Sequence, residues 1–212
     1  MNMNFEKPEY KITEYVEKNH YGKFELEPLE RGFGTTIGNA LRRVMLSSMP
    51  GSAITSVKIE GVMHEFQKID GVVEDVTSII LNLKSVVIKN HTHENKKIHL
   101  YADKEGVVKA GDIEVDADLE IVNPDLVICN LVQGGKIDME MTVGCGRGYV
   151  DSKENKKILG DTVQGLIPID SLYSPIERVS YEVTDARVGQ NENYDKLTMN
   201  VYTNGSITPE EA

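Results

Sequence analysis

The sequence has little of what several classes of protein need. It contains no Trp, and aromatic residues make up 6% of its 212 residues, which argues against a wide stacking platform for single-stranded nucleic acid. No apolar run approaches the roughly 18 residues of a membrane-spanning helix. The N-terminus, MNMNFEKPEYKITEY, is polar and has no signal-peptide core. We therefore expect a cytoplasmic protein without a membrane anchor.

Cysteine is also scarce. The two cysteines, Cys129 and Cys145, are too few for a disulfide framework and lack the spacing of a metal site. Cys129 lies in the apolar run LVICNL, where a cysteine packs as a small hydrophobic residue. Cys145 lies in a Gly-rich stretch and is expected to be the more reactive of the two. Neither is surrounded by the pattern of a catalytic nucleophile.

Positive charge is in deficit. Lys and Arg together number 23 against 34 Asp and Glu, which gives a formal net charge of −11. Binding to nucleic acid depends largely on clustered Lys and Arg that release counterions. The charge balance therefore argues against a stand-alone nucleic-acid-binding module, which would need a local basic face and would show salt-dependent binding to DNA.

The remaining composition is that of a globular protein, with 40% hydrophobic and 27% charged residues. Apolar and polar residues alternate with period two in six segments, which predicts half-buried strands at 23–29, 55–60, 98–102, 137–143, 178–183 and 196–202. Helical periodicity appears in two segments, 35–49 and 71–86. Loops are predicted at 90–97 and 144–161. Mixed strands with two helices indicate an α+β fold.

Two patterns suggest metal sites, but neither is complete. Residues 112–121 (DIEVDADLEI) alternate strictly and predict a strand with five acids on one face. A row of carboxylates lacks the wrapped geometry of a calcium site, so this face is expected to meet solvent or a partner. His91, His93 and His99 lack a cysteine and a fourth ligand. We expect no metal ion.

A small enzyme is the other alternative. The run GCGRGYV resembles a phosphate cradle, but it lacks the preceding strand and following helix of a P-loop. It predicts a tight structural loop with Arg147 in an ion pair. An enzyme built around Cys145 or Asp116 would need a convergent pocket, and alkylation of the cysteine or mutation of the aspartate would then abolish turnover.

The first predicted helix has two distinct faces. At 100° per residue, one face collects Ile37, Ala40, Leu41, Val44, Met45 and Ser48, which indicates core or helix packing. The opposite face holds Asn39, Arg43 and Leu46. Arg is enriched at protein interfaces, because its planar guanidinium forms several hydrogen bonds while its stem packs. The outer face is therefore either an interface or a solvated face with one stray Leu.

Residues Leu26–Gly51, LEPLERGFGTTIGNALRRVMLSSMPG, resemble the signature of the N-terminal domain of bacterial RNA polymerase alpha subunits. Further motifs follow in the order expected of that family: GVVEDVTSIILNLKSV, GRGYV, SPIERVSYEVTDARV, DKLTMNVYTNG and the final TPEEA. The resemblance covers nearly the whole chain.

The resemblance implies a two-part architecture. A dimerisation subdomain would be made from residues 1–51 and 171–212, and a mostly β subdomain, residues 52–170, would be inserted into it. The implied function is a non-catalytic assembly scaffold that forms a homodimer and recruits the beta and then the beta-prime subunit for DNA-templated transcription. Such a chain is an enzyme only as a subunit of the nucleotidyltransferase complex, without catalytic residues or cofactors of its own.

The resemblance also implies roles for individual residues. Ile37, Leu41, Val44 and Met45 would belong to dimer and core packing, Arg43 and Leu46 match positions implicated in binding beta, and Lys84, Ile169 and Ile176 match other contacts to the large subunits. The local pattern leaves alternatives open for the last three. Lys84 is a favourable cation at a helix C-terminus, and the two isoleucines could be core residues.

The last residues predict the opening of another helix. Thr208 suits the N-cap, Pro209 the first helical position, and two glutamates the first turn. In the family a second dimerisation helix is expected after TPEEA, followed by a linker and a C-terminal domain that touches promoter DNA. This chain is therefore expected not to bind promoter DNA, and its dimer is expected to be weaker.

Overall fold

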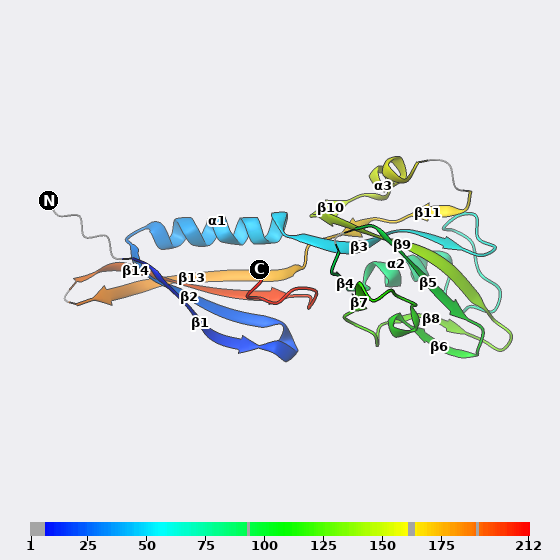
Figure 1. Ribbon diagram of the computed structural model, residues 1–212, viewed down its shortest axis with the longest axis horizontal. Coiled ribbons are helices and arrows are strands. Elements are labelled where there is room, and N and C mark those ends of the chain that lie inside the picture. The colour runs from blue at the N-terminus through cyan, green and yellow to red at the C-terminus, as the bar shows by residue number, and fades with distance from the viewer. Residues whose placement is uncertain (1–6, 93, 161–163, 190) are drawn as a thin grey trace. The chain divides into compact units, whose positions relative to one another are not determined.

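The computed structural model describes residues 7–92, 94–160, 164–189 and 191–212. The chain divides into two compact units (Figure 1). Unit 1 combines residues from both ends, 1–49 and 175–212, and unit 2 is the continuous stretch 50–174.

Unit 1 contains one four-stranded antiparallel sheet. Its strand order is β1 (Glu9–Val16), β2 (Tyr21–Glu30), β14 (Asn191–Thr203) and β13 (Ile176–Val188). A short 3-10 helix, η1 (Glu17–Asn19), joins the first two strands. β13 and β14 form a long hairpin, and β2 from the N-terminal end pairs with β14 from the C-terminal end. Neither end of the chain can build this sheet alone.

The core of unit 1 lies between one face of this sheet and helix α1 (Phe33–Ser48). The alternation in β14 decides which side chains enter it: Leu197, Met199 and Val201 are 1–6% exposed. Their polar neighbours point to the other face, because successive side chains of a strand point in opposite directions. Both predicted strands of this hairpin are confirmed.

Unit 2 is built on a second four-stranded sheet of order β11 (Leu166–Pro168), β3 (Pro50–Ile59), β9 (Ile137–Arg147) and β5 (Lys96–Ala102). Three two-stranded sheets accompany it: β4 (Ile88–Asn90) with β7 (Leu119–Ile121), β6 (Gly106–Lys109) with β8 (Val127–Leu131), and β10 (Tyr149–Val150) with β12 (Ser171–Leu172). The helical elements are α2 (Val76–Lys84), α3 (Ser152–Leu159) and the 3-10 helix η2 (Ala110–Asp112).

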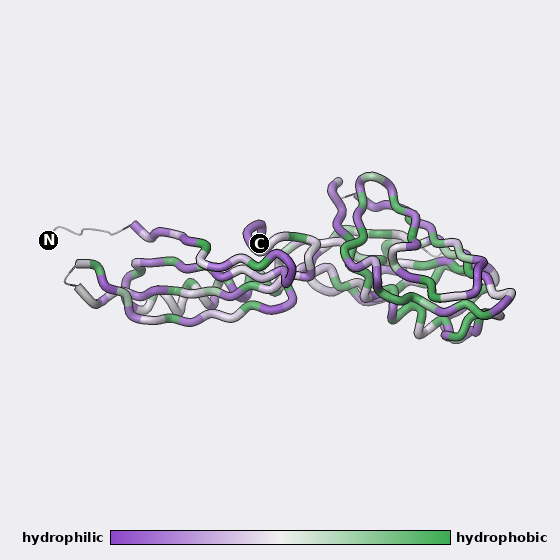
Figure 2. Tube along the Cα trace, turned by 90° about the horizontal axis from the view of Figure 1, so that it is seen from below, coloured by the Kyte–Doolittle hydropathy of each residue, from purple (hydrophilic) through white to green (hydrophobic). Residues whose placement is uncertain are grey.

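Helix α2 anchors the core of unit 2. Val76, Ile79 and Leu83 are fully buried, at the helical spacing of three and four residues. They join a large cluster that includes Val57 and Met141 from the sheet, and Figure 2 shows the hydrophobic stretches of these strands. The α+β class, the six predicted strands and the two predicted helices are all confirmed.

Two of the predictions are wrong. Residues 144–161 were expected to form a loop, but they contain the end of β9, strand β10 and helix α3. Residues 112–121 were expected to form one strand, but only Leu119–Ile121 does so. The reason is local hydrogen bonding: Asp112 accepts from the backbone N–H of Lys109 at 2.7 Å and closes η2.

The glycines of GCGRGYV serve packing. Tyr173 is 6% exposed, and a Cβ on Gly146 would lie 2.7 Å from its ring. Gly148 has φ +63°, which favours glycine, and its carbonyl accepts from the N–H of Tyr173 at 2.8 Å. This run is therefore a strand with room for a tyrosine ring, and the predicted tight loop is corrected.

Candidate protein-interaction surfaces

Helix α1 begins at a carboxylate supplied by another strand. Its N-cap, Gly32, has φ +89° and no side chain to offer. Asp195 of β14 replaces that function: its Oδ2 accepts from the backbone N–H groups of Gly32 at 2.8 Å and Gly34 at 3.1 Å. The first N–H groups of a helix have no partner within the helix, and a carboxylate there also faces the positive end of the helix dipole. The start of α1 is thereby fixed to β14.

Small residues allow α1 to lie close to the sheet. A Cβ on Gly38 would lie 2.6 Å from the ring of Tyr181 and 2.8 Å from Leu197. Further along the same side, Met45 is buried, and Arg42 Nε donates to the carbonyl of Val179 at 3.3 Å. The side of α1 that meets the sheet therefore combines glycine at the closest approach with apolar residues such as Met45.

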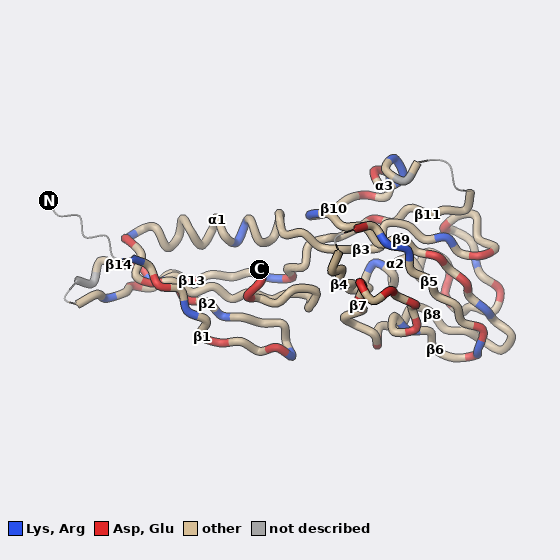
Figure 3. The backbone as a smooth tube through the Cα atoms, in the orientation of Figure 1, with Lys and Arg blue, Asp and Glu red and all other residues tan. Residues whose placement is uncertain are grey.

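Part of the apolar surface of α1 is left uncovered by the sheet. Phe33 is 52%, Leu41 41% and Val44 55% exposed, whereas Ile37 is partly buried. The predicted apolar face is thus divided. Met45 belongs to the core, and Leu41 and Val44 are available to a partner. Figure 3 shows that α1 carries few charges, and its sequence confines them to two adjacent arginines.

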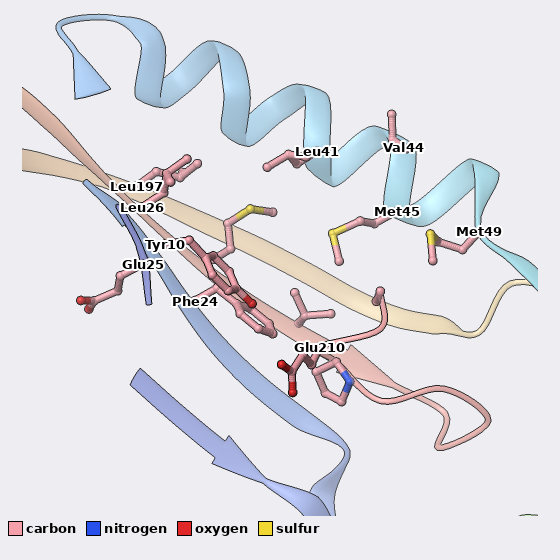
Figure 4. Close-up of a pocket in the computed structure, with 14 residues that line it drawn as sticks. Tyr10, Phe24, Glu25, Leu26, Leu41, Val44, Met45, Met49, Leu197 and Glu210 are labelled. Carbon is pink, nitrogen blue, oxygen red and sulfur yellow. The ribbon is translucent and has the colours of Figure 1, made fainter. Parts of the chain in front are cut away.

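An apolar groove runs beside α1 (Figure 4). It lies between the helix and strands β1, β2 and β14, and its lining includes Tyr10, Phe24, Leu41, Val44 and Met49. Tyr10 is 58% exposed and stacks on Phe24 with ring centroids 5.9 Å apart. We call this feature the α1 groove. It continues the exposed apolar side of the helix onto the uncovered part of the sheet.

The C-terminal residues border this groove. Thr208 N donates to Glu211 Oε2 at 2.8 Å, and Glu211 N donates to Thr208 Oγ1 at 3.2 Å. These reciprocal bonds form a capping box, which confirms the predicted N-cap. Pro209 and Ala212 line the α1 groove. A capped turn therefore lies at the edge of the apolar surface.

Arg43 and Leu46, predicted on one outer face of α1, have different surroundings. Arg43 is exposed, whereas Leu46 is partly buried against the core of unit 1. Arg43 can present its whole guanidinium to a partner. Leu46 can offer only part of its side chain, because the rest packs beneath.

Lys84 lies at the end of α2 in a three-part contact. Its Nζ donates to Asp170 Oδ2 at 2.7 Å, and Asp170 Oδ1 accepts from the backbone N–H of Ser152 at 2.9 Å. These bonds, the one from Lys84 most of all, hold the pKa of Asp170 below its usual value. Asp170 thereby joins the C-terminus of α2 to the N-terminus of α3.

Ile169 and Ile176, the other two predicted contact residues, are core residues. Ile169 is 2% exposed within unit 2, and Ile176 is 6% exposed within unit 1. This placement is the alternative that their local sequence left open. In this structure their side chains can support a contact surface from beneath.

Sequence reasoning missed one exposed apolar site. Phe66 is 79% and Leu81 56% exposed, and both line a cleft with Lys84, Pro168 and Asp170. We call it the Phe66 cleft. The segment before α2 has no periodicity, so the pattern gave no reason to single out Phe66. Leu81 could have been found, because it lies opposite the buried side of a helix whose other apolar residues are internal.

No three His, Cys, Asp or Glu side chains among the described residues gather as a metal site would require; His93 lies outside the described residues. Cys129 is fully buried, and burial raises its pKa to about 12, which confirms its place in the core. No helix in the described ranges is long and apolar enough to cross a membrane.

Comparisons with known proteins identify the family of this chain. A family model described as RNA polymerase Rpb3/RpoA insert domain matches residues 57–174, nearly all of unit 2. The chain is 58% identical over 210 residues to the DNA-directed RNA polymerase subunit alpha of Desulfitobacterium hafniense, and 56% identical to those of Desulforamulus reducens and Moorella thermoacetica. Each alignment covers 99% of this chain and 66% of the relative, so the chain spans about two thirds of the length of these relatives. It therefore belongs to the family of bacterial RNA polymerase alpha subunits.

Proposed function

We propose that this chain is a non-catalytic assembly scaffold of a bacterial RNA polymerase in the cytoplasm, which forms a homodimer and recruits the beta and then the beta-prime subunit. The observation that carries the proposal is the exposed apolar side of α1 with the adjoining α1 groove. Contiguous exposed apolar surface marks sites of protein association. The relatives are subunits of a DNA-directed RNA polymerase, which supports a role within that complex. Catalysis would belong to other subunits.

The homodimer would use the apolar surface of unit 1. In an isologous dimer the same patch of each copy meets across a two-fold axis. Leu41 and Val44, exposed on one side of a helix with few charges, suit such a self-complementary contact. The capped turn at Thr208 would lie at its edge.

The large subunits would meet other surfaces. Arg43 would contact beta, since its exposed guanidinium can form several hydrogen bonds at once. Lys84, paired with Asp170, would contribute to a second surface on unit 2. Leu46, Ile169 and Ile176 would act mainly by supporting these surfaces from the core.

An Arg43→Ala variant tests the proposal. A truncated interface anchor typically costs about 2 kcal/mol, or roughly 30-fold in the dissociation constant. We expect immobilised beta to capture the variant that much more weakly, while Thr35→Ala, an exposed change on the same helix, binds normally. Light scattering should give a mass near twice 23.6 kDa for wild type and both variants. Normal capture of Arg43→Ala would refute its role, and a wild-type monomer at all concentrations would refute dimerisation by this surface.

A further inference from the structure

The segment 60–75, between β3 and α2, combines negative charge with exposed apolar side chains. It carries five acidic residues against one lysine, and Figure 3 shows the acidic positions of unit 2. Phe66, in the middle of this segment, is the most exposed large apolar side chain in the described part of the chain. An acidic surface with an exposed aromatic ring at its centre favours a partner with a positively charged side chain that can stack on the ring.

The backbone around Phe66 is held in place. Thr77 Oγ1 of α2 donates to the carbonyl of Glu65 at 2.9 Å, and Val76 N donates to the carbonyl of Gln67 at 3.2 Å. The side-chain oxygen of Gln67 accepts from the backbone N–H groups of Met63 and His64. The phenyl ring is therefore presented by an ordered loop, which lowers the entropy that binding would otherwise cost.

The Phe66 cleft presents polar and apolar side chains together beside this ring. Leu81 is more than half exposed at the cleft, whereas Ile80 and Ile169 line it from the core. Lys84 is the one cation among the described lining residues, and it is already paired with Asp170. The cleft can thus receive an apolar side chain, but it has little spare positive charge for an acidic partner.

Two of the five acidic side chains, Glu65 and Asp70, have no partner among the described residues, and of these Glu65 lines the Phe66 cleft. Glu60 pairs with Lys136, Glu74 accepts from Asn130, and Asp75 caps α2 at Ser78. The carboxylate of Glu65 has no hydrogen bond or ion pair in the described part of the chain and is exposed.

A guanidinium fits an aromatic ring beside a free carboxylate. It stacks on the ring face through a cation–π contact, and it donates paired hydrogen bonds to a carboxylate. Lysine makes the same contacts less well, because its ammonium is a compact, strongly hydrated charge. The juxtaposition of Glu65 and Phe66 therefore selects arginine.

We propose that the Phe66 cleft binds a segment of a large RNA polymerase subunit that carries an arginine next to an apolar side chain. The arginine stacks on Phe66 and pairs with Glu65, and the apolar side chain enters the cleft beside Leu81. This inference rests on the proposed function, since it names the chemistry by which unit 2 would meet a large subunit.

Binding of the full-length chain to purified beta and beta-prime subunits tests the cleft. We expect Phe66→Ala to weaken binding of one of them by roughly 30-fold. Glu65→Gln should weaken it less and should reduce the dependence of binding on salt, because it removes a screened charge pair. Val73→Ala and Glu105→Gln, exposed residues outside the cleft, serve as matched controls and should bind normally.

A cross-link identifies the occupant directly. A photoreactive benzophenone analogue in place of Phe66 should attach to a large-subunit peptide with an arginine within a few residues of the attachment point. A peptide without arginine, or a second copy of this chain, would overturn the inference. Normal binding by Phe66→Ala alongside weak binding by Arg43→Ala would overturn it and leave the scaffold standing. If wild type binds neither large subunit, the proposed function itself fails, and the inference with it.

Discussion

Replacing Asp195 by alanine should release the start of α1. The carboxylate accepts from two backbone N–H groups at the beginning of the helix and is only 7% exposed. In the alanine variant both N–H groups lose their acceptor, and Gly32 has no side chain that could replace it. The two N–H groups can then form hydrogen bonds only with water, and this requires the first turn of α1 to unfold.

The size of the effect follows from three overlapping contributions. Hydrogen bonds to a charged group contribute about 1.5–3 kcal/mol, removal of an N-cap costs about 0.5–2 kcal/mol, and the helix dipole adds up to about 2 kcal/mol at a partly buried site. The same oxygen provides all three, so they do not add fully. We expect the free energy of unfolding of unit 1 to fall by about 2–3 kcal/mol. Asp195→Asn keeps an oxygen acceptor and should lose about half as much.

Native-state hydrogen exchange is the suitable assay, because a chain of two units need not unfold in one transition. The amides of Gly32 and Gly34 should lose protection first, followed by the rest of α1. Asp185 provides a control: it is an exposed carboxylate directly opposite Asp195 on β13. Its replacement by alanine should leave α1 protected. Unchanged exchange at Gly34 in Asp195→Ala would refute the cap as the link between α1 and β14.

Two further predictions concern packing and pH. Gly38→Ala should lower the stability of unit 1 by about 1–3 kcal/mol, because the new methyl group meets the ring of Tyr181. Urea unfolding measures this loss, and Asn39→Ala, the control, should leave the stability nearly unchanged. An unchanged stability in Gly38→Ala would contradict the close approach of α1 to the sheet. The second prediction concerns the pKa of His99, which lies above its usual value of 6.5. The main cause is the hydrogen bond to Asp138; burial opposes it, and the negative charges of Asp138 and Glu114 add to it. The contribution of His99 to the free energy of unfolding should be complete below pH 6.5 and should disappear as the pH rises through the raised pKa. An NMR titration that gives His99 a pKa at or below 6.5 would contradict the hydrogen bond to Asp138.

The regular elements could be predicted where one face of an element meets the core. In β14 the alternation of Leu197, Met199 and Val201 with polar residues reflects a sheet that is covered on one side. In α2 the spacing of Val76, Ile79 and Leu83 reflects a helix buried on one side. In both elements the apolar residues recur on the one side that the core covers, so the periodic pattern predicts the burial.

The side of α1 that meets the sheet could not be predicted from apolar pattern. Gly38 marks that side because the backbone comes too close for a side chain. The large apolar residues Leu41 and Val44 were correctly grouped, but they form an exposed surface. Helix α1 carries both a buried and an exposed apolar surface, and periodicity alone does not say which one is internal.

Short polar elements were missed for a different reason. Helix α3 has the sequence SKENKKIL, which lacks an apolar stripe. Its stability comes from local contacts: the side chain of Asp151 accepts from the N–H of Glu154 at 2.7 Å, and the buried Asn155 donates to the carbonyl of Ile169 at 2.7 Å. The N-cap was readable in the sequence, but the buried asparagine depends on a residue that only the fold brings near.

The pairing of β2 with β14 sets an order of events during synthesis. β2 and its neighbour β1 emerge from the ribosome early, but β14, the neighbour of β2 on the other side, is made only after residues 50–174 have been translated. Unit 2 is continuous and can close while unit 1 is still incomplete, as domains generally fold in turn during translation. The apolar side of α1 is held as a defined surface only once Asp195 has arrived. In the proposed homodimer, two copies would therefore meet through it only after residue Asp195 of each has been translated.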